Sequence, residues 1–205
     1  ATVEFLDLEP AAIEHIDRPL FDATKGQLAF KAARGLMKLD EAPCEAILIV
    51  EFFDDGFDKL AALDKRHVGL RRLVCTDPIE QEMVRTVRKS GLSLVTACKG
   101  PAKPTAGIED VCVPPQSLPD YVRGLMKILS DRGLGGSFYG HAASGLLHVR
   151  PKVDLHTADG IAKYREVADE VSALCRQFKG SLAAEHGLGI ARTQYLPDHI
   201  GPALL

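Results

Sequence analysis

Helical periodicity is strongest in two segments of the second half of the chain. Apolar residues recur at three- and four-residue spacing in Ser117–Arg132, and this pattern predicts an amphipathic helix that ends at Gly133. Thr157–Phe178 is the longest predicted helix, with Thr157 as its N-cap. Further helices are predicted at Glu9–Ile16, Ala23–Lys38, Phe57–Lys65, Pro78–Ser90 and Gly189–Tyr195.

Runs of β-favouring residues predict the strands. The longest run, Ala46–Phe53, is almost entirely apolar and predicts a central strand buried on both faces. The small residues Ala142–Gly145 predict a tight turn that joins Gly136–His141 and Leu146–Arg150 in a hairpin. Shorter strands are predicted at Val3–Leu6, Leu70–Thr76, Gly91–Cys98, Glu109–Val113 and Ser181–Glu185, and an irregular loop at Lys99–Gly107.

The order of these elements predicts an α+β fold. Strands and helices follow a split β-α-β order, typical of ferredoxin-like units in which helices cover an antiparallel sheet. A length of 205 residues suffices for one large domain or two small, closely packed ones. Because the chain starts without methionine and stops within a helix-like segment, we interpret residues 1–205 as one piece of a larger polypeptide.

Composition excludes several classes of protein. The hydrophobic fraction of 46% and charged fraction of 26% are those of an ordinary soluble globular domain. A net charge of -3 gives no general reason to bind nucleic acid, and no apolar run approaches the length of a membrane span. The five cysteines include no C-x-x-C pair, which argues against a structural zinc, an iron–sulfur cluster or a disulfide framework and favours the cytoplasm.

Candidate chemistry lies in two short segments near the end of the chain. His141 and His148 flank the predicted hairpin turn, so their imidazoles can approach one point from two strands. Glu185 and His186 are neighbours in a predicted strand and are expected to point to opposite sides. One of them can complete a His–His–Glu metal site while the other faces an adjacent pocket. Alternatively, the histidines are surface or core residues, and Glu185 caps the following helix.

Four segments belong to a recognisable pattern: Val-Arg-Lys-Ser-Gly-Leu at 87–92, Ile-Glu-Asp-Val-Cys-Val-Pro at 108–114, the segment of His141 and His148, and Glu-His-Gly-x-Gly at 185–189. Together they resemble the FAD-linked oxidase family of D-2-hydroxy acid dehydrogenases. The resemblance covers roughly residues 45–205. The segment from Gly140 to Pro151 is most similar to long bacterial members that carry a fused iron–sulfur region.

The resemblance implies a flavoenzyme that transfers a hydride from the α carbon of a D-2-hydroxy acid to FAD. In this family FAD is held by a separate N-terminal domain, and the matching segment is the C-terminal domain that caps the substrate. By residue match, His141, His148 and Glu185 are the expected ligands of a divalent metal (zinc, iron or manganese), and His186 is the expected proton acceptor.

The resemblance also implies residues that bind the substrate. Arg88 matches a position that holds a substrate carboxylate, although arginine on a helix is more often simply exposed. Where many relatives have lysine, this chain has Ile108, and Lys103 in the preceding loop is the expected substitute. Ser144 and Leu146 replace the Asp and Asn of many relatives. Glu109 and Asp110 are interpreted as structural anchors without a catalytic role.

These implications define the expected function and its alternatives. The substrate class is D-lactate, D-2-hydroxyglutarate or glycolate, and the partners are the flavin domain and iron–sulfur region of the same polypeptide, with a homo-oligomer allowed. The isolated chain is expected to be colourless and inactive, and the whole protein cytoplasmic or peripheral to the inner membrane face. The alternatives are a His–His–Glu metal hydrolase that activates water, and a non-catalytic ferredoxin-like binding module.

Overall fold

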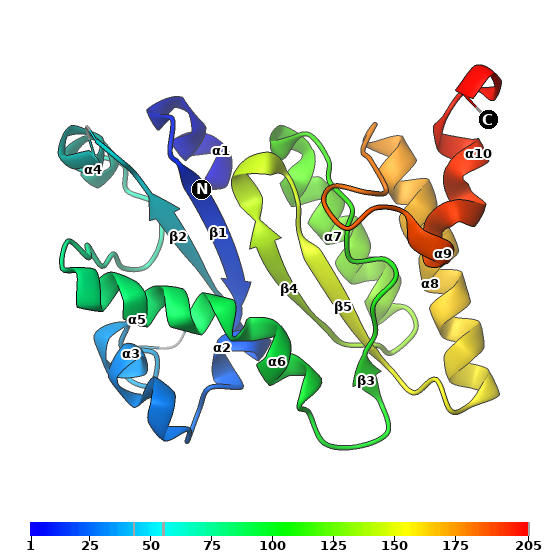
Figure 1. Cartoon of the computed structure of the whole chain (residues 1–205), viewed down its shortest axis with the longest axis horizontal. Coiled ribbons are helices and arrows are strands. Elements are labelled where there is room, and N and C mark those ends of the chain that lie inside the picture. Colours follow the sequence, from blue (N-terminus) through cyan, green and yellow to red (C-terminus); the bar gives the residue numbers. More distant parts are fainter. Residues whose placement is uncertain (43, 55, 205) are drawn as a thin grey trace. The chain divides into compact units, whose positions relative to one another are not determined.

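The first unit of the chain, Ala1–Cys98, contains an antiparallel pair of strands in the computed structural model, which describes residues 1–42, 44–54 and 56–204 (Figure 1). Strand β1 (Ala12–Asp17) pairs with β2 (Ala46–Glu51), with Ala12 opposite Glu51. The helices and 3₁₀ turns of this unit are α1 (Thr2–Phe5), η1 (Leu6–Leu8), α2 (Arg18–Asp22), η2 (Leu28–Phe30), α3 (Lys31–Leu36), α4 (Gly56–Asp64), α5 (Pro78–Lys89) and α6 (Gly91–Thr96).

Buried aliphatic and aromatic side chains from several elements form the core of this unit. Ile13 and Ile16 of β1, Leu20 and Phe21 of α2 and Val87 of α5 are each at most 1% exposed. Helix α3 contacts α5, and α2 contacts α6.

The second unit, Lys99–Leu205, is built on the hairpin of β4 (Gly136–His141) and β5 (His148–Val153). Strand β5 also pairs antiparallel with the short β3 (Lys103–Pro104) on its other edge. The helices and 3₁₀ turns are η3 (Pro115–Ser117), α7 (Leu118–Ser130), η4 (Ala142–Ser144), α8 (Ala158–Gln177), α9 (Gly189–Arg192), η5 (Thr193–Tyr195), α10 (Leu196–His199) and η6 (Pro202–Leu204).

One face of the second unit's hairpin belongs to its hydrophobic core. Helices α7 and α8 pack against each other, and Figure 1 shows α7 behind the hairpin. The buried side chains include Tyr121 and Leu125 of α7, Val167 of α8 and Val149 and Val153 of β5. Since side chains alternate along a strand, His148 and Arg150 lie on the opposite face of β5 from Val149 and Val153.

The α+β class and the strongest sequence patterns are confirmed. The hairpin, the helices near 57–65, 78–90, 117–132 and 157–178, and the short helix from Gly189 all form. Thr157 caps α8 by accepting a hydrogen bond from the backbone N–H of Gly160. Asp77 caps α5 by accepting from Ile79 and Glu80.

Several predictions of weaker patterns are wrong. Val3–Leu6 is largely helix, and most of Glu9–Ile16 lies in β1, because pairing with β2 outweighs local helix preference. Gly91–Cys98 is mostly helix α6, which follows α5 directly. Leu70–Thr76 has no regular structure. Ala23–Lys38 is helical in part, since η2 and α3 together cover residues 28–36.

Burial and pairing correct the remaining strand predictions. The residues of β2 are half-buried or exposed, so this strand is not the doubly buried one that its sequence predicts. Neither Glu109–Val113 nor Ser181–Glu185 forms a strand. The two segments are joined by an isolated bridge between Cys112 and Ser181 and by hydrogen bonds from backbone N–H groups to Asp110. The loop Lys99–Gly107, predicted to be irregular, contains β3.

The five cysteines carry free thiols. Among the described residues, no helix combines the length and apolar character needed to cross a membrane.

Candidate metal and proton-transfer site

The hairpin turn brings two histidines together. His141 ends β4 and His148 begins β5, and the centroids of their rings are 5.8 Å apart. Between them Gly145 adopts a left-handed conformation (φ +76°), and a Cβ there would lie 1.8 Å from the carbonyl oxygen of Val113. The turn therefore requires glycine, and its close contact with the segment before α7 fixes where the two histidines point.

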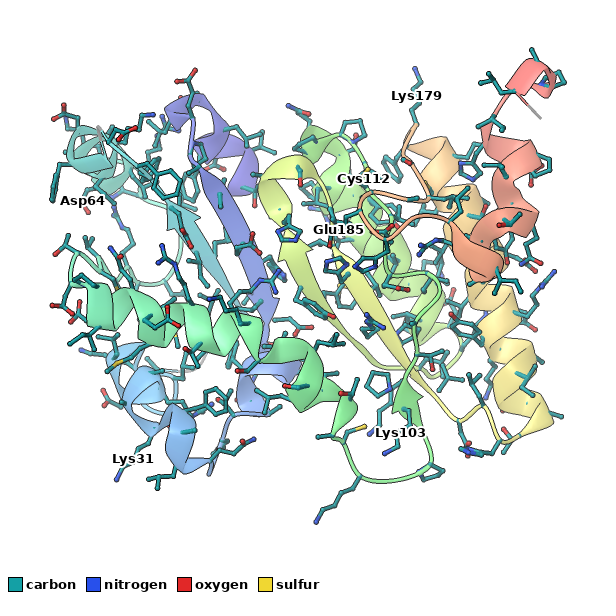
Figure 2. The ribbon with its side chains drawn as sticks, in the orientation of Figure 1. Lys31, Asp64, Lys103, Cys112, Lys179 and Glu185 are labelled. Atoms are coloured by element: carbon teal, nitrogen blue, oxygen red, sulfur yellow. The ribbon has the colours of Figure 1, made fainter. Side chains whose placement is uncertain are left out.

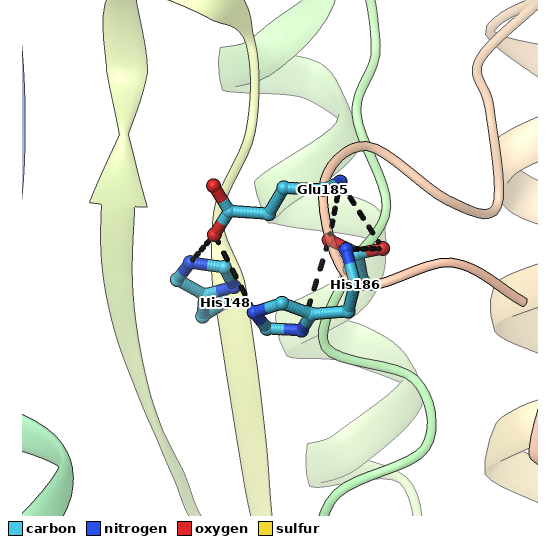
Figure 3. Close-up of side chains that lie close together, drawn as sticks. His148, Glu185 and His186 are labelled. Atoms are coloured by element: carbon cyan, nitrogen blue, oxygen red, sulfur yellow. Dashed lines mark hydrogen bonds and ion pairs between the residues drawn. The ribbon is translucent and has the colours of Figure 1, made fainter. Parts of the chain in front are cut away.

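A second segment brings Glu185 and His186 to the same place. Residues 184–186 form a bend and not a strand, so both side chains lie beside His148, against the expectation that they would point to opposite sides (Figure 3). The carboxylate oxygens of Glu185 lie 2.9 Å from His148 Nε2, 3.5 Å from His141 Nε2 and 3.4 Å from His186 Nε2. The rings of His148 and His186 stack with centroids 5.0 Å apart.

The tautomer of His148 is set by a backbone carbonyl. Its Nδ1 lies 3.3 Å from the carbonyl oxygen of Glu109, which can only accept, so Nδ1 carries the hydrogen. In the neutral ring the lone pair of Nε2 then faces the carboxylate of Glu185. Two acceptors 2.9 Å apart are favourable when a proton or a metal ion lies between them.

The donor atoms fit a divalent metal. Ligands at about 2.1 Å in tetrahedral geometry are about 3.4 Å from one another, close to the 2.9 and 3.5 Å separations of Glu185 from the two hairpin histidines. Imidazole nitrogen and carboxylate oxygen are ligands that zinc, iron and manganese accept. His148 is almost fully buried, whereas the side chains of His141 and Glu185 are 38% and 42% exposed, which leaves one side of the cluster accessible.

Asp110 also lies close to these histidines and Glu185, but its carboxylate already accepts hydrogen bonds from the backbone. Asp110, His148, Glu185 and His186 each offer one atom, and these atoms lie within 4.8 Å of one another. However, both oxygens of Asp110 accept hydrogen bonds from backbone N–H groups of residues 184–186. That group of four residues does not include His141, whose Nε2 lies 3.5 Å from the carboxylate of Glu185. The set His141, His148 and Glu185 is therefore a proposal, which rests on the family resemblance and on the hydrogen bonds that occupy Asp110.

His186 is oriented by a carboxylate. Its Nδ1 lies 3.5 Å from Glu109 Oε1 and 3.8 Å from Asp110 Oδ1. Burial acts to raise the pKa of Glu109, but backbone hydrogen bonds and the charges of Arg150 and Arg192 outweigh burial, so this pKa is lowered. A carboxylate therefore faces each ring nitrogen of His186, Glu109 at Nδ1 and Glu185 at Nε2.

The environment of His148 predicts a pH dependence of stability in the metal-free protein. Burial lowers the pKa of His148 below 6.5; the nearby His186 and His141 act in the same direction, and Glu185 opposes them. The folded state then binds fewer protons than the unfolded state, so we expect stability to fall as the pH drops through about 6.5 and to level off below the lowered pKa.

Denaturant unfolding of the metal-free protein between pH 5 and 8 measures this effect. His148→Gln, which does not titrate in this range, is expected to flatten the acid side of the profile. An equally steep profile in the variant would contradict the assignment to His148.

The two predicted substrate-binding residues belong to different units of the chain. Arg88 belongs to α5 of the first unit, where its guanidinium pairs with Glu14 at 2.7 Å. Lys103 is opposite Val153, five residues along β5 from His148, or about 17 Å at about 3.3 Å per residue. Figure 2 shows Lys103 and Glu185 well apart in the second unit. The structure does not bring Lys103 to the candidate metal ligands.

Arg150 and Ser137 are absent from the candidate site that the sequence predicts. They are direct partners on β5 and β4, on the same face as His148. Among the described residues, the buried Nε of Arg150 and Oγ of Ser137 have no hydrogen-bond partner. The available signal was the two-residue spacing of His148 and Arg150 in a predicted strand.

Comparisons with known proteins agree on one family. The model of the family "FAD linked oxidases, C-terminal domain" matches residues 1–205. A D-2-hydroxyglutarate dehydrogenase of Pantoea ananatis is 37% identical over 97% of this chain, and one of Haemophilus influenzae is 30% identical over 94%. The glycolate oxidase subunit GlcD of Bacillus subtilis is 24% identical over 91% of this chain. The chain spans about a fifth of the length of the two dehydrogenases and 38% of GlcD.

Proposed function

The chain belongs to the FAD linked oxidases, C-terminal domain family, and we propose on that premise that it is the substrate- and metal-binding domain of an FAD-dependent D-2-hydroxy acid dehydrogenase. The observation that carries the proposal is the convergence of His141 and His148 on the carboxylate of Glu185, with His186 beside them. The FAD-binding domain, and any iron–sulfur region, belong to the remainder of the polypeptide.

Each side chain of the cluster has a role in this proposal. His141, His148 and Glu185 hold the divalent metal, which supplies Lewis acidity to the substrate's hydroxyl and carboxylate oxygens when bound. His186 Nε2 accepts the hydroxyl proton, and Glu109 stabilises the resulting imidazolium through Nδ1. FAD supplies the acceptor for the hydride from the α carbon.

Arg150 and Ser137 support a dicarboxylic substrate, D-2-hydroxyglutarate. A buried polar group without a partner costs about 1–3 kcal/mol, and a ligand carboxylate would satisfy both Arg150 Nε and Ser137 Oγ. Arg150 lies two residues from His148 on the same strand face, about 7 Å along β5. That spacing suits the two carboxylates of a five-carbon diacid, whereas lactate and glycolate have only one.

Anaerobic mixing of D-2-hydroxyglutarate with the full-length polypeptide tests the proposed reaction. The flavin absorbance is expected to bleach as 2-oxoglutarate forms, and D-lactate is expected to react more slowly. Absence of bleaching with every D-2-hydroxy acid would remove the proposed function.

Arg150→Gln tests the choice of substrate. The variant is expected to raise KM for D-2-hydroxyglutarate about 100-fold, because a charge-assisted contact to the second carboxylate is lost. Turnover of D-lactate should change little. Arg123→Gln, which replaces an exposed arginine of α7, is the matched control. An equal loss with both substrates would show that Arg150 does not select the diacid.

A further inference from the structure

We propose that Asp110, assisted by Arg192, is the positioning residue that shapes the loop Ala184–Gly187 and thereby sets the places of Glu185 and His186. This inference rests on the proposed function of those two side chains. It assigns Asp110 no contact with metal or substrate.

The carboxylate of Asp110 binds three successive N–H groups of the loop. Oδ2 accepts from Ala184 and His186, each at 3.0 Å, and Oδ1 accepts from Glu185 at 3.1 Å. The backbone carbonyl of Asp110 also accepts from Ala184 at 3.1 Å. The side chain of Asp110 is fully buried, so these bonds are shielded from water.

These contacts explain why the sequence pattern is misleading at this point. In a strand, the side chains of residues 185 and 186 would lie on opposite faces. Three N–H groups that converge on one carboxylate instead impose a bend. Glu185 Oε1 and His186 Nε2 then lie 3.4 Å apart. The bend places both side chains beside His148, where the proposed function needs one to bind the metal and the next to accept the substrate proton.

Arg192 also contacts both Asp110 and the loop. Its side chain is 6% exposed and lies between two carboxylates, with Nη2 3.5 Å from Asp110 Oδ2 and Nη1 3.9 Å from Glu109 Oε2. Nη2 also donates a hydrogen bond to the carbonyl oxygen of Gly187, at the end of the loop. The guanidinium thus balances two buried negative charges and holds the loop at its second end.

Metal affinity separates positioning from general stability. Asp110→Asn replaces one acceptor oxygen by an NH₂ group that would face a loop N–H. In the full-length polypeptide this variant is expected to weaken binding of Zn²⁺ or Mn²⁺, measured separately by equilibrium dialysis, about 10- to 100-fold. We also expect kcat to fall more than KM rises, because His186 is misplaced.

Asp17→Asn is the matched control. Asp17 is another buried aspartate that accepts a backbone N–H, that of Leu20, in the first unit. Its replacement is expected to lower stability while leaving metal affinity unchanged. If Asp110→Asn binds metal as tightly as Asp17→Asn, the positioning role is wrong.

Two further variants keep the outcomes distinct. Arg192→Lys keeps the positive charge but loses the planar guanidinium that reaches two carboxylates, and it is expected to weaken metal binding about 10-fold. If Asp110→Asn does not fold, unchanged metal affinity in Arg192→Lys would overturn the proposal. His148→Ala tests the ligand set itself. Metal binding that survives in both His148→Ala and His141→Ala would reject the ligand set of the proposed function. Loss of metal in His148→Ala but not in Asp110→Asn would reject only the positioning role.

Discussion

Replacing His148 by alanine is expected to weaken binding of the divalent metal more than about 100-fold, since loss of even a supporting contact to a ligand costs about 10- to 100-fold. His148 contributes a buried Nε2 whose lone pair is directed by the bond from Nδ1 to the carbonyl of Glu109. Turnover should fall about 1,000-fold or more, because the substrate hydroxyl loses the Lewis acid that lowers its pKa. Metal content and kcat of the full-length polypeptide are the measurements.

Two further variants serve as a comparison and a control for His148→Ala. His141→Ala removes a more exposed candidate ligand and is expected to lose metal with less disturbance of the core. His156→Ala removes a histidine whose side chain is 81% exposed and which pairs with Asp154, and it should leave metal and turnover unchanged. Retention of a full complement of metal by both His148→Ala and His141→Ala would contradict the ligand assignment.

Replacing His186 by glutamine is expected to lower kcat about 100- to 10,000-fold while the metal stays bound. Glutamine keeps a polar group near Glu185 but cannot accept a proton at neutral pH. Steady-state rates across pH 5–9, with metal analysis of the same samples, measure both effects.

Metal loss in His186→Gln would have a different meaning. It would place His186 among the ligands, as its 3.4 Å separation from the carboxylate of Glu185 permits geometrically. A rate within a few-fold of the unsubstituted protein would exclude His186 as the proton acceptor.

The parts of the fold that local patterns determine were predictable from the sequence. Helices α7 and α8 have long apolar stripes with defined ends, and the hairpin has a turn of small residues that includes the required Gly145. The errors lie where distant contacts decide. Residues 12–17 form a strand because β2 pairs with them, and Leu70–Thr76 remains irregular although its composition favours a strand.

The candidate site was likewise predictable from the sequence only in part. His141 and His148 could be brought together from sequence because they flank one turn, and the family resemblance added Glu185 and His186. The bend at Glu185 could not be predicted, because the carboxylate that accepts its backbone N–H belongs to Asp110, 75 residues away in the sequence. Asp110 accepts hydrogen bonds from three backbone N–H groups, as expected of an anchor. Glu109 and Asp110 lie in a turn, however, and both face His186, unlike neighbours in a strand.

The most direct test of the central claim is a crystal structure of the full-length polypeptide with anomalous diffraction data at the absorption edge of its bound metal. The account predicts one anomalous peak in contact with His141 Nε2, His148 Nε2 and the carboxylate of Glu185, with His186 beside it and not bound to it. A peak bound by Asp110 and His186, or the absence of a peak from this cluster in fully active protein, would contradict it.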